Sequence, residues 1–196
     1  MVFNMSGEKI AGGMSYQTLG GIDYNIIEYI LNSDNSSEIF QKNKEYYFAS
    51  IKKIMARLIL AKTRIDNVKL KENEALFLNQ KISNGIKWLD TLKISIENAK
   101  DSLEFQKSVS YKEWHAVKLI PQSAEGYASS ILIEARLEKM DNENVKIMKE
   151  AHLHLNMANN LLKNLLNSDS FINFKHAEKQ LIEAYAELYL AFKFLG

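Results

Sequence analysis

The chain contains no cysteine, only one proline and no long apolar run. Without cysteine it has no thiolate nucleophile, thiolate-bound zinc, iron–sulfur cluster or thioether-linked haem. No stretch reaches the roughly 20 apolar residues that span a bilayer, so we expect no transmembrane segment. The first residues lack the basic and apolar regions of a secretory signal. We therefore take the cytoplasm as the default location, and the cell surface or the extracellular space as the alternative if a leader has been removed.

A strong charge of one sign is also missing, because 25 Lys and Arg stand against 24 Asp and Glu, a net charge of +1. A protein that mainly neutralises phosphate backbones carries a clear basic excess. The lysine clusters of this chain alternate with acidic residues, which is typical of a solvated helix face. A nucleic acid-binding bundle is therefore the third of three hypotheses, and no nucleic acid partner is expected.

The first residues contain little that can pack. The chain has 196 residues, of which 46% are hydrophobic, and this is typical of a globular protein. Five of its eight glycines lie in the first 21 residues, where they raise the entropy of the unfolded chain. Residues 1–22 are therefore predicted to be a flexible Gly-rich N-terminal arm. Residues 23–31 have the apolar spacing of a short amphipathic helix, and residues 23–196 are expected to form a single all-helical domain.

From residue 37 onward, apolar residues recur in alternating steps of three and four, the spacing of one stripe along a helix. This spacing predicts an antiparallel hairpin of helices over residues 37–68 and 72–100. A third helix is predicted to end near residue 140, on a stripe formed by Trp114, Val117, Ala124, Ala128, Ile131 and Ala135. Two capping boxes, Asp101 with Glu104 and Ser110 with Glu113, leave its start open. Pro121 predicts a kink or break within it.

The last two predicted helices lie on either side of residues 167–170, and both carry alanine at every seventh position. Small residues at this period let helices approach closely, which predicts a tightly packed antiparallel hairpin. These alanines are Ala151 and Ala158 in the first helix and Ala177, Ala184 and Ala191 in the second. The predicted fold class is all-α: an elongated antiparallel bundle of four to five long helices, arranged as two helical hairpins, with the short N-terminal helix and the arm.

Motifs that carry chemistry are absent from the sequence. It contains no Glu-x-x-His, no Gly-x-Ser-x-Gly and no phosphate-binding glycine loop. His152 and His154 are two residues apart, so on a helix they point about 200° away from each other. We interpret the histidines as boundary or surface side chains and expect no cofactor and no metal ion. A small-molecule or metal-dependent enzyme is the second hypothesis, with four candidate residues: His115, His152, His154 and Glu134.

The last helix carries a second apolar row, formed by Ile182, Tyr185, Tyr189 and Phe192. A helix that is apolar over so wide an arc lies centrally in the fold or contacts a partner, and burial within the monomer is the simpler interpretation. The candidate interaction surface combines this row with three residues of the arm, Tyr16, Leu19 and Ile22. The leading hypothesis is a non-enzymatic structural or protein-interaction bundle, either self-associating or bound to a protein partner in a larger assembly.

Overall fold

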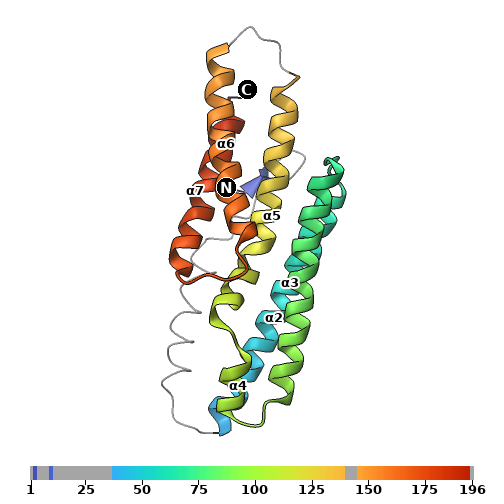
Figure 1. Ribbon diagram of the computed structural model, residues 1–196, viewed down its shortest axis with the longest axis vertical. Coiled ribbons are helices and arrows are strands. Elements are labelled where there is room, and N and C mark those ends of the chain that lie inside the picture. Colours follow the sequence, from blue (N-terminus) through green and yellow to red (C-terminus); the bar gives the residue numbers. More distant parts are fainter. Residues whose placement is uncertain (1, 4–8, 11–36, 140–144, 195–196) are drawn as a thin grey trace. The chain divides into compact units, whose positions relative to one another are not determined.

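The computed structural model describes residues 2–3, 9–10, 37–139 and 145–194. The predicted all-α class is confirmed, since these residues form helices and connecting turns apart from two short strands. The strands β1 (Val2–Phe3) and β2 (Lys9–Ile10) pair antiparallel. The helices are α2 (Ser37–Asp66), α3 (Glu72–Asn98), α4 (Ser102–Ser108), α5 (Tyr111–Leu137), α6 (Val145–Asn167) and α7 (Phe174–Lys193) (Figure 1). The rest of the predicted arm and the predicted helix at 23–31 lie outside the described residues.

Both capping boxes between α3 and α5 begin a helix. The side chain of Asp101 accepts hydrogen bonds from the backbone amides of Leu103 and Glu104, each at 2.9 Å, and so caps α4. Helix α5 begins at Tyr111, directly after Ser110. The two starts that the sequence left open are therefore the starts of two successive helices, because residues 109 and 110 interrupt the helical hydrogen bonding between them.

The chain divides into two compact units. Unit 1 comprises Met1–Met55 and Lys87–Ser110, and unit 2 comprises Ala56–Ile86 and Tyr111–Gly196. In unit 1, the ring of Phe105 on α4 packs edge-on against Phe40 and Tyr47 of α2, with centroid distances of 6.2 and 5.4 Å. An aromatic cluster therefore joins α4 to the first turns of α2.

The end of α3 is satisfied within unit 1 by a lysine of α2. Lys44 donates hydrogen bonds from Nζ to the backbone carbonyls of Glu97 and Ala99, at 3.1 and 2.9 Å. A helix end leaves its last carbonyls without intrahelical donors, and a cation also interacts favourably with the negative end of the helix dipole. Lys44 therefore stabilises the C-terminal end of α3.

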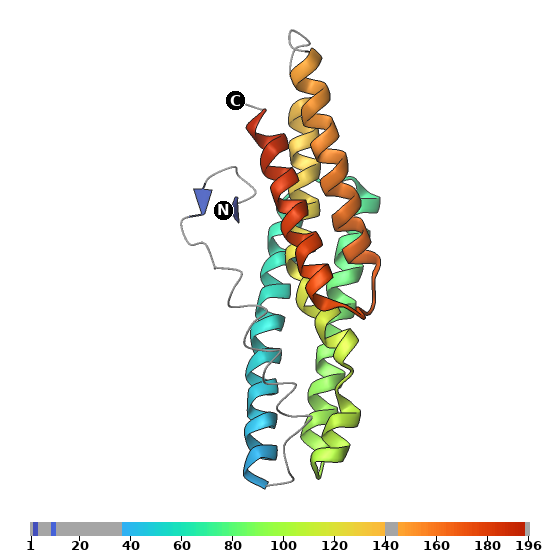
Figure 2. The same ribbon diagram turned by 90° about the vertical axis from the view of Figure 1, so that its left-hand side faces the viewer.

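Unit 2 contains three helices that pack against one another in every pair, α5, α6 and α7 (Figures 1 and 2). The contact between α6 and α7 is the most extensive. Ala151 and Ala158 of α6 are buried, as are the three alanines of α7, Ala177, Ala184 and Ala191. These five alanines, which we call the alanine seam, are therefore buried as predicted. Helices α6 and α7 form a hairpin, and residues 168–173 connect them.

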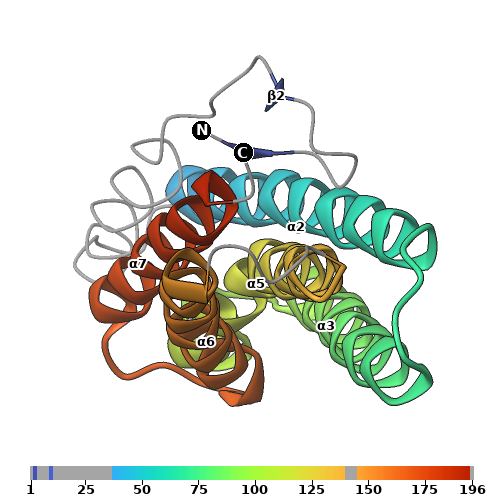
Figure 3. The same cartoon turned by 90° about the horizontal axis from the view of Figure 1, so that it is seen from above.

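Helix α5 is the most completely buried helix of unit 2. All six residues from Trp114 to Leu119 are buried, so this part of the helix has no solvent-facing side. Contacts reach α5 from α2 through Arg64, from α3 through Phe77, from α6 through Leu162 and from α7 through Tyr185. Figure 3 shows α5 beside α6. The expectation that the last helix lies centrally is wrong, since α5 holds that position within unit 2.

The buried set of α5 also differs from its predicted stripe. Trp114, Val117, Ala124 and Ala128 are buried as predicted, but Ile131 is half-buried and Ala135 is exposed. Toward its C-terminal end the helix buries Ile133 and Leu137 instead. Of the kink or break predicted at Pro121, the break is wrong, because α5 is continuous from Tyr111 to Leu137 with Pro121 buried inside it, and the kink stays a prediction.

Two glycines mark close approaches between helices of unit 2. A Cβ atom on Gly85 of α3 would lie 3.2 Å from Cδ1 of Ile120 on α5. A Cβ atom on Gly126 of α5 would lie 3.0 Å from Cδ2 of Leu162 on α6. The backbones approach closely at these positions because neither residue has a side chain. No helix in the described part of the chain is long and apolar enough to cross a membrane.

Candidate functional site

The predicted interaction surface is described only in its α7 half. Tyr16, Leu19 and Ile22 lie outside the described residues. On α7, Ile182 and Tyr189 are 46% and 45% exposed, so their expected burial in the monomer is wrong. Tyr185 and Phe192 are half-buried, and the hydroxyl of Tyr185 donates a hydrogen bond to the carbonyl of Gln122 on α5 at 2.9 Å. The outer side of α7 therefore presents apolar side chains to solvent.

The four candidate residues for an enzyme do not share one site. His115 is buried at the start of α5, and Glu134 is exposed near the other end of the same helix. His152 and His154 lie on α6 and are half-buried. Among the residues that the structure describes, no group of three or more histidines and carboxylates is placed to hold a metal ion.

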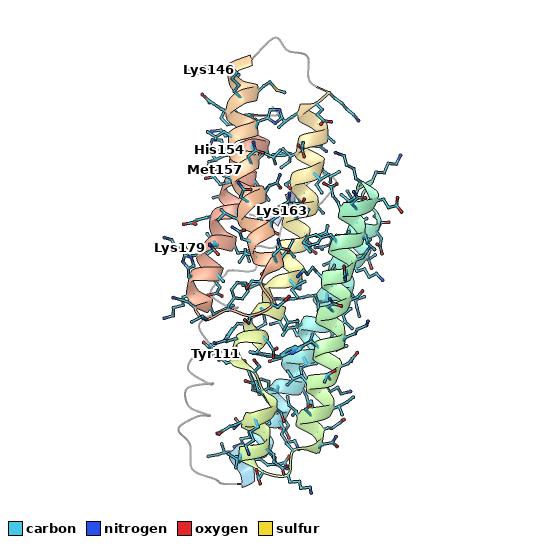
Figure 4. All side chains as sticks on the ribbon, in the orientation of Figure 1. Tyr111, Lys146, His154, Met157, Lys163 and Lys179 are labelled. Carbon is cyan, nitrogen blue, oxygen red and sulfur yellow. The ribbon has the colours of Figure 1, made fainter. Side chains whose placement is uncertain are left out.

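His154 takes part in a polar contact between α6 and α7 (Figure 4). Its Nδ1 atom lies 2.6 Å from Oε2 of Glu187, which as a carboxylate accepts the hydrogen bond. Its ring also stacks on Phe194, with centroids 6.0 Å apart and planes inclined by 11°. The arrangement orients the imidazole as a carboxylate orients a catalytic histidine, but it belongs to no group of three or more possible metal ligands among the described residues.

The most unusual chemistry lies where the first turns of α5 meet the start of α7. Local hydrogen bonds fix this junction: the side chain of Asn173 accepts from the amide of His176 at 3.1 Å and caps α7. The amide of Phe171 donates to the carbonyl of Lys112 on α5 at 3.3 Å. These contacts place Phe174, the first residue of α7, against the side chains of α5.

His115 lies inside an aromatic stack at this junction. Its ring centroid is 4.3 Å from that of Tyr111, one turn earlier on α5, and 4.0 Å from that of Phe174. The side chain is fully buried, and neither ring nitrogen has a hydrogen-bond partner among the described residues. Burial lowers the pKa of His115 from 6.5 to about 4, because the protonated, charged ring would lack the water that stabilises it in solution. At neutral pH the imidazole is therefore uncharged.

Lys118, one turn after Trp114, is the second titratable group at the junction. Its Nζ atom lies 5.9 Å from the ring centroid of Trp114 and 5.6 Å from that of Phe174, within the range of cation–π contacts. Burial lowers the pKa of Lys118 from 10.5 to about 8, and the nearby carboxylate of Glu178 raises it in part. The ammonium form therefore predominates at neutral pH, held between two aromatic rings.

A half-buried carboxylate, that of Glu125, lies further along α5. Its Oε1 accepts a hydrogen bond from Nη1 of Arg64 on α2 at 2.8 Å. Burial raises the pKa of Glu125, and the positive charges of Arg64 and Arg57 oppose that rise. Glu134, the acid of this helix that was the candidate from the sequence, is exposed, whereas Glu125 is half-buried.

Sequence reasoning missed Lys118 and Glu125 because charged residues were assigned to solvent faces. The available signal for Lys118 was its spacing, since it lies four residues after Trp114 and therefore on the same helix face. No protein-family model, curated protein or solved structure matches the chain. Its function is therefore argued from its own residues and contacts.

Proposed function

We propose that this protein is a non-enzymatic structural or interaction bundle that associates with copies of itself or with a protein partner in a larger assembly. The observation that carries the proposal is the outer side of α7, where Ile182 and Tyr189 are 46% and 45% exposed. They are seven residues apart and therefore lie on one face of the helix. Ala186 lies between them on that face and is also exposed.

This exposed row has the form of a helix-packing stripe. Ile182, Ala186 and Tyr189 follow the four-and-three spacing that a helix uses to bury residues against another helix. Exposed lysines flank the apolar centre of this row at Lys179 and Lys193. An apolar centre with a charged rim is the usual composition of a protein–protein contact, because the centre loses water on association and the rim stays solvated.

The proposal also includes the arrangement of the helices and the domain bounds. We propose an elongated antiparallel bundle of four to five long helices as a single domain over residues 23–196, with residues 1–22 as a flexible Gly-rich arm. The arm residues Tyr16, Leu19 and Ile22 complete the interaction surface in this proposal. A homo-oligomer or a complex with another protein is expected, and nucleic acid is not an expected partner.

The proposal is tested by size-exclusion chromatography with light scattering on the full chain over a range of concentrations. We expect a mass above that of the 22.5 kDa monomer, which decreases when Ile182→Glu places a charge in the apolar row. Ile172→Glu is the matched control, because Ile172 is 86% exposed and precedes α7, so the same charge change should leave the assembly intact. A strictly monomeric wild type at the highest concentration contradicts self-association.

The second hypothesis, a metal-dependent enzyme, has one specific observation in its favour. The hydrogen bond of His154 to Glu187, at 2.6 Å, has the form of the outer carboxylate contact that orients a metal-binding histidine. Stoichiometric metal in elemental analysis of the purified protein, lost on His154→Ala, would replace our proposal by this one. Absence of metal at stoichiometric level leaves the interaction bundle as the conclusion.

A further inference from the structure

The aromatic stack at the α5–α7 junction encloses a titratable group that no hydrogen bond from the described residues stabilises. The His115 ring lies between Tyr111 of its own helix and Phe174 of α7, at centroid distances of 4.3 and 4.0 Å. It is fully buried, and both ring nitrogens lack a hydrogen-bond partner in the part of the chain that the structure describes. Most buried polar groups are hydrogen-bonded, so this arrangement is unusual.

The charged groups around the stack do not favour a second positive charge. On α5, Lys118 places an ammonium between Trp114 and Phe174, while Lys112 and Glu113 are exposed. On α7, Lys175 and His176 are exposed, and Glu178 acts on Lys118.

In the connection before α7, Asp169 is almost fully exposed and contacts Lys81 at 3.4 Å. Burial is the cause that shifts the pKa of His115, and no carboxylate of the described residues acts on it. A proton added to this ring therefore meets an edge-on contact with Tyr111, a tilted contact with Phe174 and, among the described residues, no hydrogen-bond acceptor.

We propose that the Tyr111–His115–Phe174 stack is an acid-sensitive latch: protonation of His115 releases the first turn of α7 from the first turns of α5. In the closed latch the neutral ring packs between the two aromatic side chains as a hydrophobic group. As an imidazolium it carries two N–H donors that need acceptors, and the closed stack offers none. Opening gives both donors access to water, and this difference drives the release.

The direction of the pH effect follows from the two states of the ring. In the open latch the pKa of His115 has its ordinary value of 6.5, and in the closed latch burial lowers it to about 4. The open form therefore binds the proton more tightly. The latch contributes its full stability above pH 6.5 and loses it as the pH falls toward 4. Between pH 6.5 and pH 4, the ratio of open to closed latch rises roughly tenfold for each unit by which the pH falls.

The latch is tested by hydrogen–deuterium exchange of the full-length protein between pH 7 and pH 4, corrected for the intrinsic pH dependence of exchange. We expect peptides covering residues 111–118 and 171–178 to lose protection from exchange as the pH falls. The peptide that contains Ala158, at the contact between α6 and α7, should keep its protection. In His115→Phe, which retains a flat aromatic ring, these peptides should stay protected. His176→Phe is the matched control and should behave as the wild type, because His176 is exposed.

Two outcomes overturn the proposal. One is equal loss of protection at the junction and at Ala158, which indicates global acid unfolding rather than local release. The other is unchanged acid sensitivity in His115→Phe. If that variant does not fold, the titration of the His115 ring signal by NMR in the wild-type protein decides the matter. A pKa at or above 6.5 overturns the latch, and a pKa well below 6.5 supports it.

Discussion

Helices α5 and α7 lie in the same packed group of unit 2, but they use their apolar residues differently. Helix α7 buries one clean row that includes Ala177, Ala184 and Ala191, and leaves Ile182 and Tyr189 on its outer side. Helix α5 is buried around its whole circumference from Trp114 to Leu119, with a histidine and a lysine inside. The number of neighbouring helices, and not the apolar content of a helix, therefore decides how much of it is buried.

Helices α5 and α7 also differ in where their polar side chains lie. The polar residues of α7 lie on its solvent side or at its edge, where water or a neighbouring helix satisfies them, as His154 does for Glu187. Helix α5 also encloses titratable groups, and each of these must be neutral, as His115 is, or compensated, as Lys118 is by aromatic rings and Glu178. Substitutions in α5 should therefore have larger effects on the free energy of unfolding than those on the outer side of α7.

The largest effect is expected from Trp114→Ala on α5. Trp114 is fully buried, and removing such a large side chain leaves a cavity, so we expect a loss of about 3–5 kcal/mol in the free energy of unfolding. Tyr189→Ala on α7 is the counterpart and should cost less than about 1 kcal/mol, since that side chain is 45% exposed. Urea unfolding followed by circular dichroism measures both, and equal losses contradict the difference between the helices.

An intermediate effect is expected from Gly126→Val, which adds atoms where α5 approaches α6. Its Cβ would lie 3.0 Å from Cδ2 of Leu162, so the larger side chain must displace α6 or adopt a strained rotamer. We expect a destabilisation of about 1–3 kcal/mol. Ala135→Val on the exposed part of the same helix is the control and should cost only its lower helix propensity, about 0.5 kcal/mol. A thermal melting temperature unchanged in Gly126→Val would show that this contact is loose.

The smallest effect is expected from Lys118→Met, and it has the opposite sign. Burial lowers the pKa of Lys118 from 10.5 to about 8, so the charged form costs stability at neutral pH that an apolar side chain of similar length does not. We expect stabilisation on the order of 1–2 kcal/mol at pH 7, because a lowered pKa means that the ammonium is less stable in the folded than in the unfolded protein, even with Glu178 nearby, and each unit of pKa corresponds to about 1.4 kcal/mol.

The pH dependence of this lysine provides a second check. Because the folded-state pKa is the lower one, the wild type should gain stability as the pH rises from 8 to 10.5, and Lys118→Met should lack that gain. Lys112→Met, an exposed position on the same helix, should change neither quantity. Destabilisation by Lys118→Met would show that its contacts with Trp114 and Phe174 outweigh the loss of hydration.

Helix positions were predictable from the sequence because helix ends depend on local signals. The predicted ranges 37–68 and 72–100 correspond to Ser37–Asp66 and Glu72–Asn98, and both capping boxes begin helices. The buried row of α7 was predictable as well, since a helix packed on one side buries one stripe. At Pro121 the sequence left a kink and a break open, and only the break is excluded, because α5 continues through the proline.

The candidate site was much less predictable. Among its members, His115 was considered from the sequence, but as a boundary side chain, and Lys118, Glu178 and Glu125 were not considered. Their burial depends on contacts between α5 and helices distant in the sequence, which residue spacing within one helix does not contain. The exposure of Ile182 and Tyr189 on α7 was not predictable either, because the simpler interpretation of the sequence was that these apolar residues are buried within the monomer.

By itself the sequence determined that this protein is all-helical, where most of its helices begin and end, and which alanines line the α6–α7 seam. These features follow from periodicity and capping, which act over a few residues. Only the tertiary structure decided that α5 and not α7 is enclosed, that Lys118 contacts Trp114 and Phe174, and that His115 is buried without a hydrogen-bond partner among the described residues. The physical reason is that burial is a property of how many helices meet around a residue, and that number is set by long-range packing.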